Sequence, residues 1–198
     1  MPGRPHRGAV TVDKYADLPL SVFADEMAER KIPSPAAGSS LAAALMMAIS
    51  LLELTVSEQA EKQEGMDGRD PSDDLKRLRC WREEGKALVD GDIQAVEEMV
   101  RRGSAVGGER LLAPVCRLHE LAGEILEWVP DYLAVSGTKV SDTLIAALHL
   151  RTVWIGSWHI AGFNAKSFGW DFPLLSDWET ELKRTDAILR QVYASVRD

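Results

Sequence analysis

Two side chains with acid–base potential fall at helical spacing in the last third of the chain. Asp142 and His149 are seven residues apart, about two helical turns, so a helix places both on one face, and Asn164 falls about 40° from the same line. A carboxylate, an imidazole and an amide along one apolar face could move a proton. Each also has a structural interpretation, because Asp142 follows Ser141 at a helix start, where an acid offsets the helix dipole, and a histidine among leucines can be a core residue.

A second acidic pair lies in the segment "DGDIQAV". Asp90 and Asp92 lie beside an apolar stripe formed by Ile93, Val96 and Val100. By itself this pair is more typical of a solvated helix face than of a catalytic site.

An uncharged stretch, "IPSPAAGSSLAAALMMAIS" at 32–50, begins with loop and cap residues. Pro33 and Pro35 favour extended backbone before them, Gly38 permits a positive φ, and Ser39 or Ser40 can cap the helix that follows. The stretch therefore predicts a rigid loop that leads into a helix N-terminus. Its unpaired N–H groups suit a carboxylate, a phosphate or a polarised carbonyl, although a capped core helix with no ligand gives the same pattern.

The same stretch is too short for a membrane span. A spanning helix needs roughly 20 apolar residues, and only residues 41–52, about three turns, remain after the loop. We therefore expect a buried helix and no membrane partner.

The elements that position these residues are all predicted to be helical. Apolar periodicity and cap signals predict helices over 20–30, 39–64, 72–102 (capped by Ser72 or Asp73), 111–135, 141–168 and 174–196. The fold class is therefore all-α, an antiparallel bundle of about six helices, with residues 1–17 as a flexible tail and 18–198 as one domain. The second and fifth helices are apolar on nearly every side, which predicts either a homodimer or a central position within one subunit.

Composition excludes several classes of function. The 31 acidic residues against 23 basic ones give a net charge of −8 and no basic patch, so nucleic acid is not an expected partner. No metal-ligand spacing occurs, so we expect no metal. Cys80 and Cys116 are predicted to be free thiols, and the N-terminus lacks a secretory apolar region, which together favour a cytoplasmic protein.

The order of these segments resembles the cyclodeaminase/cyclohydrolase family, which includes the C-terminal domain of formiminotransferase-cyclodeaminase and the methenyltetrahydrofolate cyclohydrolases. The family loop S-P-T-P-G-G-G-S-x-A-A is similar to "IPSPAAGSSLAAAL", and its acidic D-A-x-A-F stretch is similar to "VDGDIQAVEEMV". Its N-x-x-x-S-D and N-x-x-x-N-x-K-S-L motifs are similar to "SGTKVSDTLIAALHL" and "WHIAGFNAKSF". The resemblance covers about residues 18–196.

The resemblance implies an all-helical homodimer that binds a reduced folate near the subunit interface. The implied reaction is either loss of ammonia from formimino-tetrahydrofolate with ring closure or hydrolysis of the methenyl bridge, with a tetrahydrofolate derivative as substrate and no tightly bound cofactor. Asp142 and Asp92 are the implied catalytic residues. The implied ligand-binding residues are Pro35, Gly38, Ser39, Ser141, Asn164 and Lys166, and we add His149 because it shares a helix face with Asp142.

Departures from the family pattern keep two alternatives open. Ala36 and Ala37 stand where the family has glycines, and Trp154, Trp158 and Trp170 add bulk on or just after the fifth helix. The first motif asparagines are also replaced, by Ser136 or Gly137 and by His159 or Ile160. The scaffold could instead serve a cyclase, deaminase or lyase that acts on a non-folate nitrogenous molecule in specialised metabolism, or a non-catalytic ligand-binding dimer.

Overall fold

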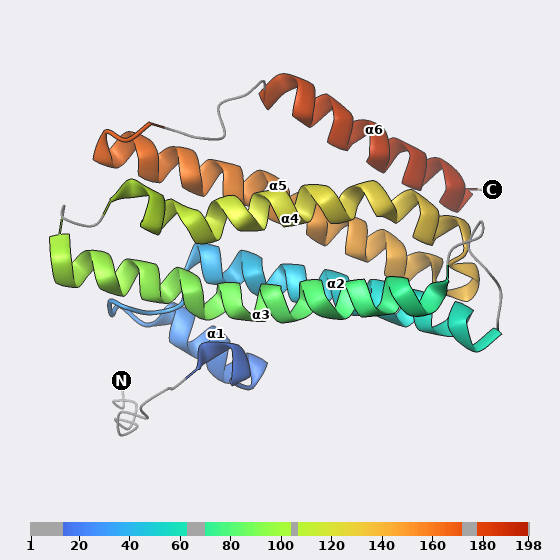
Figure 1. The fold of residues 1–198 in the computed structure, drawn as a ribbon, viewed down its shortest axis with the longest axis horizontal. Helices are drawn as coiled ribbons and strands as arrows, with labels where there is room; N and C mark the ends of the chain where they lie inside the picture. Colours follow the sequence, from blue (N-terminus) through green and yellow to red (C-terminus); the bar gives the residue numbers. More distant parts are fainter. Residues whose placement is uncertain (1–13, 63–69, 104–106, 172–177, 198) are drawn as a thin grey trace, which may run out of the picture.

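The computed structural model describes residues 14–62, 70–103, 107–171 and 178–197, and in these ranges it confirms the all-α class. No strand occurs among the described residues. Two short 3₁₀ turns, η1 and η3, and six α-helices have bounds within these ranges (Figure 1). In chain order the elements are η1 (Tyr15–Asp17), α1 (Leu20–Ala28), α2 (Ala37–Lys62), α3 (Pro71–Arg102), α4 (Gly108–Ala134), η3 (Gly137–Lys139), α5 (Val140–Phe168) and α6 (Trp178–Arg197).

The helix starts differ from the sequence expectations by a few residues. Helix α3 is capped by Asp70, whose carboxylate accepts from the Ser72 N–H at 2.8 Å, with Pro71 in the first turn, so the expected cap at Ser72 or Asp73 is wrong. Helix α2 begins at Ala37, two residues before its expected start. Helix α4 begins at Gly108 and continues through Pro114 and Pro130. The expected C-terminal end of α2 at 64 and the expected start of α6 at 174 lie outside the described residues.

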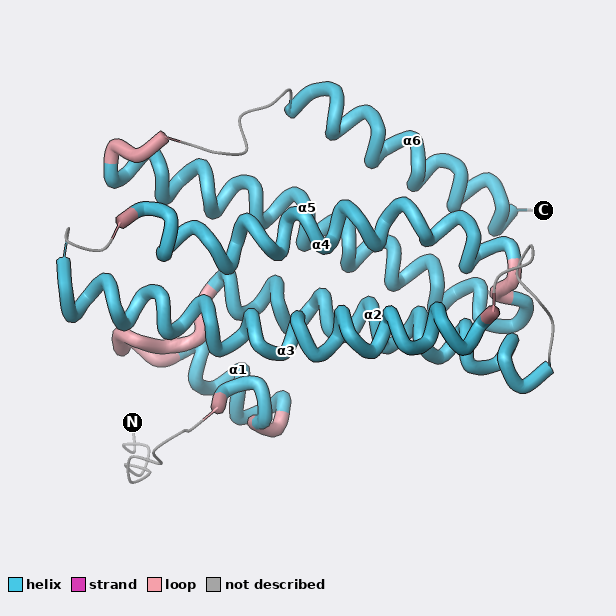
Figure 2. Tube along the Cα trace, in the orientation of Figure 1, coloured by secondary structure: helices cyan, strands magenta, loops and turns pink. Residues whose placement is uncertain are grey.

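The long helices form one elongated bundle (Figure 2). Helix α2 packs against α3 on one side and α5 on the other, α4 packs against α5 and α3, and α6 lies over α4 and α5. Helix α1 and η1 lie beside α2 and α3 at the opposite side of the bundle from α6. This arrangement places α2 and α5 at the centre.

Burial explains why α2 and α5 are so apolar. Their inward positions are fully buried, among them Leu45, Ile49 and Leu52 on α2 and Ala146 and Leu150 on α5. The two helices run antiparallel, since Leu41 of α2 faces Gly156 of α5 and Thr55 of α2 faces Thr143 of α5. They also lie close together, because a Cβ on Gly156 would be 2.9 Å from the Leu41 side chain. A central position in one subunit therefore accounts for much of the apolar pattern.

The segment Ala37–Glu61 of α2 is the one described span that is long and apolar enough, by length and composition, to cross a membrane. A core helix passes the same test, and 44% of its most apolar window is buried inside the bundle. We therefore regard α2 as the core helix that the sequence predicts.

Candidate functional site

The first turn of α2 is bound to a carboxylate from α3. Asp92 Oδ2 accepts hydrogen bonds from the Ser39 backbone N–H at 2.9 Å and from the Ser39 hydroxyl at 2.9 Å. Ser39 is the third residue of α2, and its N–H is one of the donors that a helix leaves without an internal partner. The expectation that the Ser39 or Ser40 hydroxyl caps this helix is therefore wrong, because Asp92, 53 residues away in sequence, accepts from the N–H group.

Gly38 makes this approach possible. A Cβ on Gly38 would lie 2.2 Å from Asp92 Oδ1, which is far inside van der Waals contact. Ala36 and Ala37 are both exposed, whereas Gly38 is buried against the carboxylate. Of the three positions where the resembled family has glycines, the one that faces Asp92 is thus the one that remains glycine, and Pro35 beside the loop is buried.

Burial dominates the electrostatics of this contact. Desolvation raises the pKa of Asp92 above its ordinary value, while the two hydrogen bonds from Ser39 act in the opposite direction because they favour the ionised form. A carboxyl group with a raised pKa is better suited to exchange a proton near neutral pH than an exposed aspartate. Asp92 is therefore the strongest acid–base candidate among the predicted residues.

The neighbouring acid, Asp90, fastens the N-terminal segment. Its Oδ1 accepts from the Tyr15 backbone N–H at 2.7 Å, and Lys86 on the same helix pairs with Asp17 at 2.6 Å. Residues 15–17, which the sequence placed at the end of the tail, therefore form a turn bound to α3. Asp90 therefore has a structural role.

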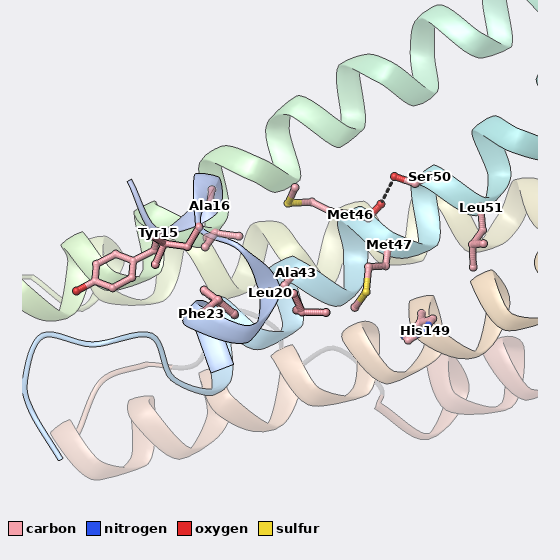
Figure 3. A pocket seen from close by; sticks show the side chains of 12 residues that line it. Tyr15, Ala16, Leu20, Phe23, Ala43, Met46, Met47, Ser50, Leu51 and His149 are labelled. Carbon is pink, nitrogen blue, oxygen red and sulfur yellow. Dashed lines mark hydrogen bonds between the residues drawn. The ribbon is translucent and has the colours of Figure 1, made fainter. Parts of the chain in front are cut away.

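A cavity of about 520 Å³ lies between this N-terminal segment and α2 (Figure 3). It begins one helical turn beyond Ser39, at Ala43, and extends along α2 to Leu51. Most of its wall is aliphatic, aromatic or thioether surface, and none of the described residues that line it is Lys, Arg, Asp or Glu. The lining consists of Tyr15, Ala16, Leu18, Leu20, Phe23, Ala43, Met46, Met47, Ser50, Leu51, Val89 and His149.

His149 is the predicted ligand-binding residue that lines this cavity. Figure 3 shows its ring on α5, across from Met47 of α2. Sequence reasoning did not single out Met46, Met47 or Tyr15. The adjacent methionines inside an uncharged run were the available signal, because flexible thioethers commonly line adaptable binding surfaces.

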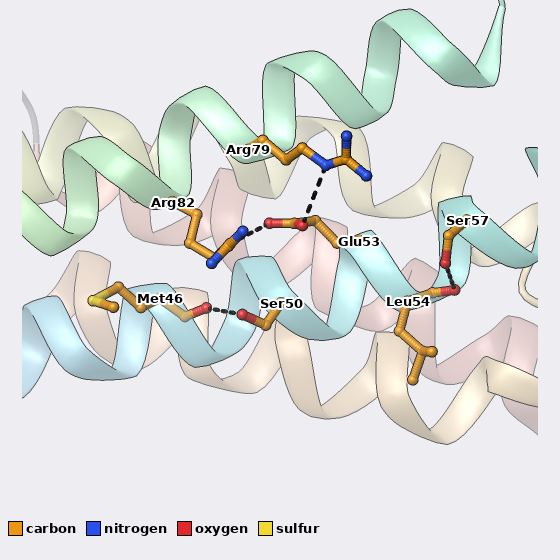
Figure 4. A network of polar contacts seen from close by, with 7 residues as sticks. All are labelled: Met46, Ser50, Glu53, Leu54, Ser57, Arg79 and Arg82. Carbon is orange, nitrogen blue, oxygen red and sulfur yellow. Dashed lines mark hydrogen bonds and ion pairs between the residues drawn. The ribbon is translucent and has the colours of Figure 1, made fainter. Parts of the chain in front are cut away.

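Beyond the cavity, two arginines of α3 are paired with a glutamate of α2 (Figure 4). Glu53 accepts from Arg82 Nε at 2.5 Å and lies 3.9 Å from Arg79 Nε, so these two α3 arginines tie α3 to α2. Ser50, at the rim of the cavity, donates its hydroxyl to the Met46 carbonyl at 2.9 Å.

The other predicted residues are divided between the two ends of the bundle. Asp142 and Ser141 lie at the start of α5, where Thr143 contacts Thr55 at 3.0 Å. Thr55 is 16 residues along α2 from Ser39, about 24 Å, so one chain does not bring Asp142 to Asp92. Asn164 and Lys166 lie eight and ten residues beyond Gly156, which faces Leu41, and therefore share the end that holds Asp92.

The tryptophans do not fill the cavity. Trp154 and Trp158 stack on Trp178 of α6, with ring centroids 5.2 and 4.1 Å apart, and Trp170 stacks on Phe168 at 4.7 Å. His119, which the sequence analysis did not single out, stacks on Trp154, and its Nδ1 lies 2.9 Å from the Trp154 carbonyl oxygen. Burial lowers the pKa of His119, so this ring is a neutral packing element at pH 7.

No group of His, Cys, Asp and Glu side chains in the described residues could hold a metal ion. No protein-family model matches the chain, and no curated protein matches it significantly. The structure is similar to the crystal structure of formiminotetrahydrofolate cyclodeaminase from Thermotoga maritima, with a TM-score of 0.67, 22% identity and 91% of each chain covered. The two proteins share a fold. This shared fold agrees with the resemblance read from the motifs.

Proposed function

We propose that this chain is an enzyme of the formimino-tetrahydrofolate cyclodeaminase or methenyltetrahydrofolate cyclohydrolase type, with Asp92 as its central carboxyl group. The observation that carries the proposal is the contact of Asp92 with Ser39 behind Gly38, at the start of the central helix of a cyclodeaminase fold. This contact joins two of the motifs on which the family resemblance depends.

The chemistry suits a partly buried carboxyl group. In the deaminase direction, N10 of the folate attacks the carbon of the protonated formimino group and gives up its own proton. The bond from that carbon to the terminal nitrogen then breaks as this nitrogen takes up one proton and leaves as ammonia. Asp92 would supply this proton when it is protonated and would stabilise the cationic amidinium when it is ionised. Asn164 and Lys166, at the same end of the bundle, are the proposed ligand-binding partners.

Asp142 keeps its predicted role only in an assembly. It lies at the far end of α2 from Asp92, so a site that uses both carboxylates needs Asp142 from a second subunit. We therefore retain the homodimer as part of the proposal, together with a cytoplasmic location, in which Cys80 and Cys116 stay free thiols. No tightly bound cofactor is required by this chemistry.

The test is a titration with 5,10-methenyltetrahydrofolate that follows both the heat of binding and the decay of the methenyl absorbance. We expect saturable binding with accelerated decay. Asp92→Asn should reduce the rate by at least about 10²-fold, whereas the same exchange at exposed Asp73 should leave it unchanged. Equal rates for wild type and Asp92→Asn would refute the assignment of Asp92.

A second candidate is the same scaffold used for a non-folate nitrogenous molecule. The observation that favours it is the apolar cavity one turn from Ser39, because none of its described lining residues is a Lys or Arg that could receive the carboxylates of a folate. Absence of methenyltetrahydrofolate binding would favour this candidate, and absence of any turnover would favour a non-catalytic dimer.

A further inference from the structure

The cavity beneath the N-terminal segment has the form of a built small-molecule site. Four parts of the chain converge on it: residues 15–23, helix α2, Val89 of α3 and His149 of α5. Its volume of about 520 Å³ lies within the roughly 300–1,000 Å³ that small-molecule sites occupy. We propose that this cavity binds an uncharged, ring-bearing small molecule, whether or not Asp92 is catalytic.

Three cations of α3, the helix that contributes Val89 to the cavity wall, are already paired. Arg79 and Arg82 face Glu53, and Lys86 faces Asp17. Asp90 accepts from the Tyr15 backbone rather than entering the cavity. A ligand carboxylate or ammonium would therefore lose its hydration without meeting an opposite charge, which strongly disfavours charged ligands.

The lining chemistry favours a ring. Phe23 offers an aromatic face, and the thioethers of Met46 and Met47 make favourable contacts with aromatic rings. Two polar side chains interrupt this surface: Ser50 already donates to the Met46 carbonyl but still has acceptor capacity, and the His149 imidazole can donate or accept. The fitting ligand thus carries an apolar ring system and one hydrogen-bonding group.

The test uses two probes with the same ring and different charge. The full-length protein is titrated calorimetrically at pH 8 with 2-naphthylmethanol and with 2-naphthoate. We expect one-to-one binding of the alcohol and at least 10-fold weaker binding of the carboxylate. Naphthoate that binds as tightly as the alcohol, or no saturable binding of either probe, would overturn the proposal.

Two substitutions locate the binding. Ala43→Phe fills the cavity from α2 and should weaken alcohol binding at least 10-fold, whereas Ala87→Phe, on the exposed side of α3, should not. Ser50→Phe blocks the rim from an exposed position, so it tests the same point if Ala43→Phe fails to fold. Unchanged binding in the folded cavity variants would refute the location. Probe binding that appears only when subunits dissociate would show that a second copy occupies the cavity.

Discussion

Asp92 combines a structural contact with an unfavourable charge environment. It satisfies an N–H group in the first turn of α2, as a helix cap does, and the positive end of the helix favours its ionised form. Burial nevertheless raises its pKa, so ionisation opposes folding. A residue retained only for stability would avoid this conflict, whereas catalytic carboxyl groups commonly show it.

This conflict predicts the stability of Asp92→Asn. Because the folded-state pKa is raised, the penalty for ionised Asp92 is absent below the ordinary pKa of 3.8 and grows as the pH rises through the folded-state pKa. Asparagine can still accept from Ser39 without a charge. We expect Asp92→Asn to be at least as stable as wild type at pH 7. In acid, the free energy of unfolding of wild type should rise relative to that of the variant, as measured by urea unfolding at pH 4 and 7. A variant that is much less stable at pH 7 would instead identify Asp92 as an ionised helix cap.

Gly38 is the residue on which the geometry of Asp92 depends. Gly38→Ala puts a methyl group 2.2 Å from the present position of Asp92 Oδ1 and should displace the carboxylate from Ser39. We expect a loss of about 1–3 kcal/mol in unfolding free energy and loss of any activity that needs Asp92. Gly91→Ala is the matched control, because no atom lies within 4 Å of its Cβ position. Equal effects of the two substitutions would show that helix propensity, and not the Asp92 contact, is responsible.

At the level of elements, three tryptophans attach α6 to the bundle. Trp178 in the first turn of α6 stacks on both Trp154 and Trp158 of α5. Ion pairs Arg151–Asp186 and Arg184–Glu127 reinforce the attachment farther along α6. Because surface ion pairs contribute little, the aromatic contact should account for most of the attachment.

Removal of this contact should release α6 without unfolding the bundle. We expect Trp178→Ala to weaken the docking of α6 by about 2 kcal/mol. Hydrogen exchange of α6 amides should accelerate while exchange in α2 and α5 stays slow. Tyr193→Ala, at an exposed position on the same helix, is the control. Uniform acceleration across all helices would mean that α6 is an integral part of the core.

Local patterns predicted the helices well and the site poorly. Apolar periodicity and turn residues placed the helix boundaries that lie within the described residues to within a few positions, because these signals act over one or two turns. The partner of Ser39 is 53 residues away, so no local pattern could distinguish a self-capped helix from one bound to Asp92. Likewise, Asp142 and His149 share a helix face as predicted, but only the antiparallel packing of α2 and α5 separates Asp142 from Asp92.

For the whole molecule, the central position of α2 and α5 explains their inner faces but not their outer ones. Leu54 and Ile145 are both 44% exposed and lie near the Thr55–Thr143 contact, and Figure 4 shows Leu54 pointing away from α3. Asp142 lies three residues before Ile145 on α5 and therefore on the same side of that helix. A homodimer formed through this face would cover the apolar side chains and bring Asp142 to a second subunit.

The homodimer is tested by placing charge on this face. Leu54→Glu combined with Ile145→Glu should convert a dimer into a folded 21.8-kDa monomer in analytical ultracentrifugation, because neither side chain belongs to the buried core. Val100→Glu, at a position 63% exposed on α3, is the control and should remain dimeric. If Asp142 acts across the interface, the double variant should also lose turnover while it still folds and Asp92 still contacts Ser39. A wild-type protein that sediments as a monomer would remove Asp142 from the site and leave Asp92, Asn164 and Lys166 as its candidate polar residues.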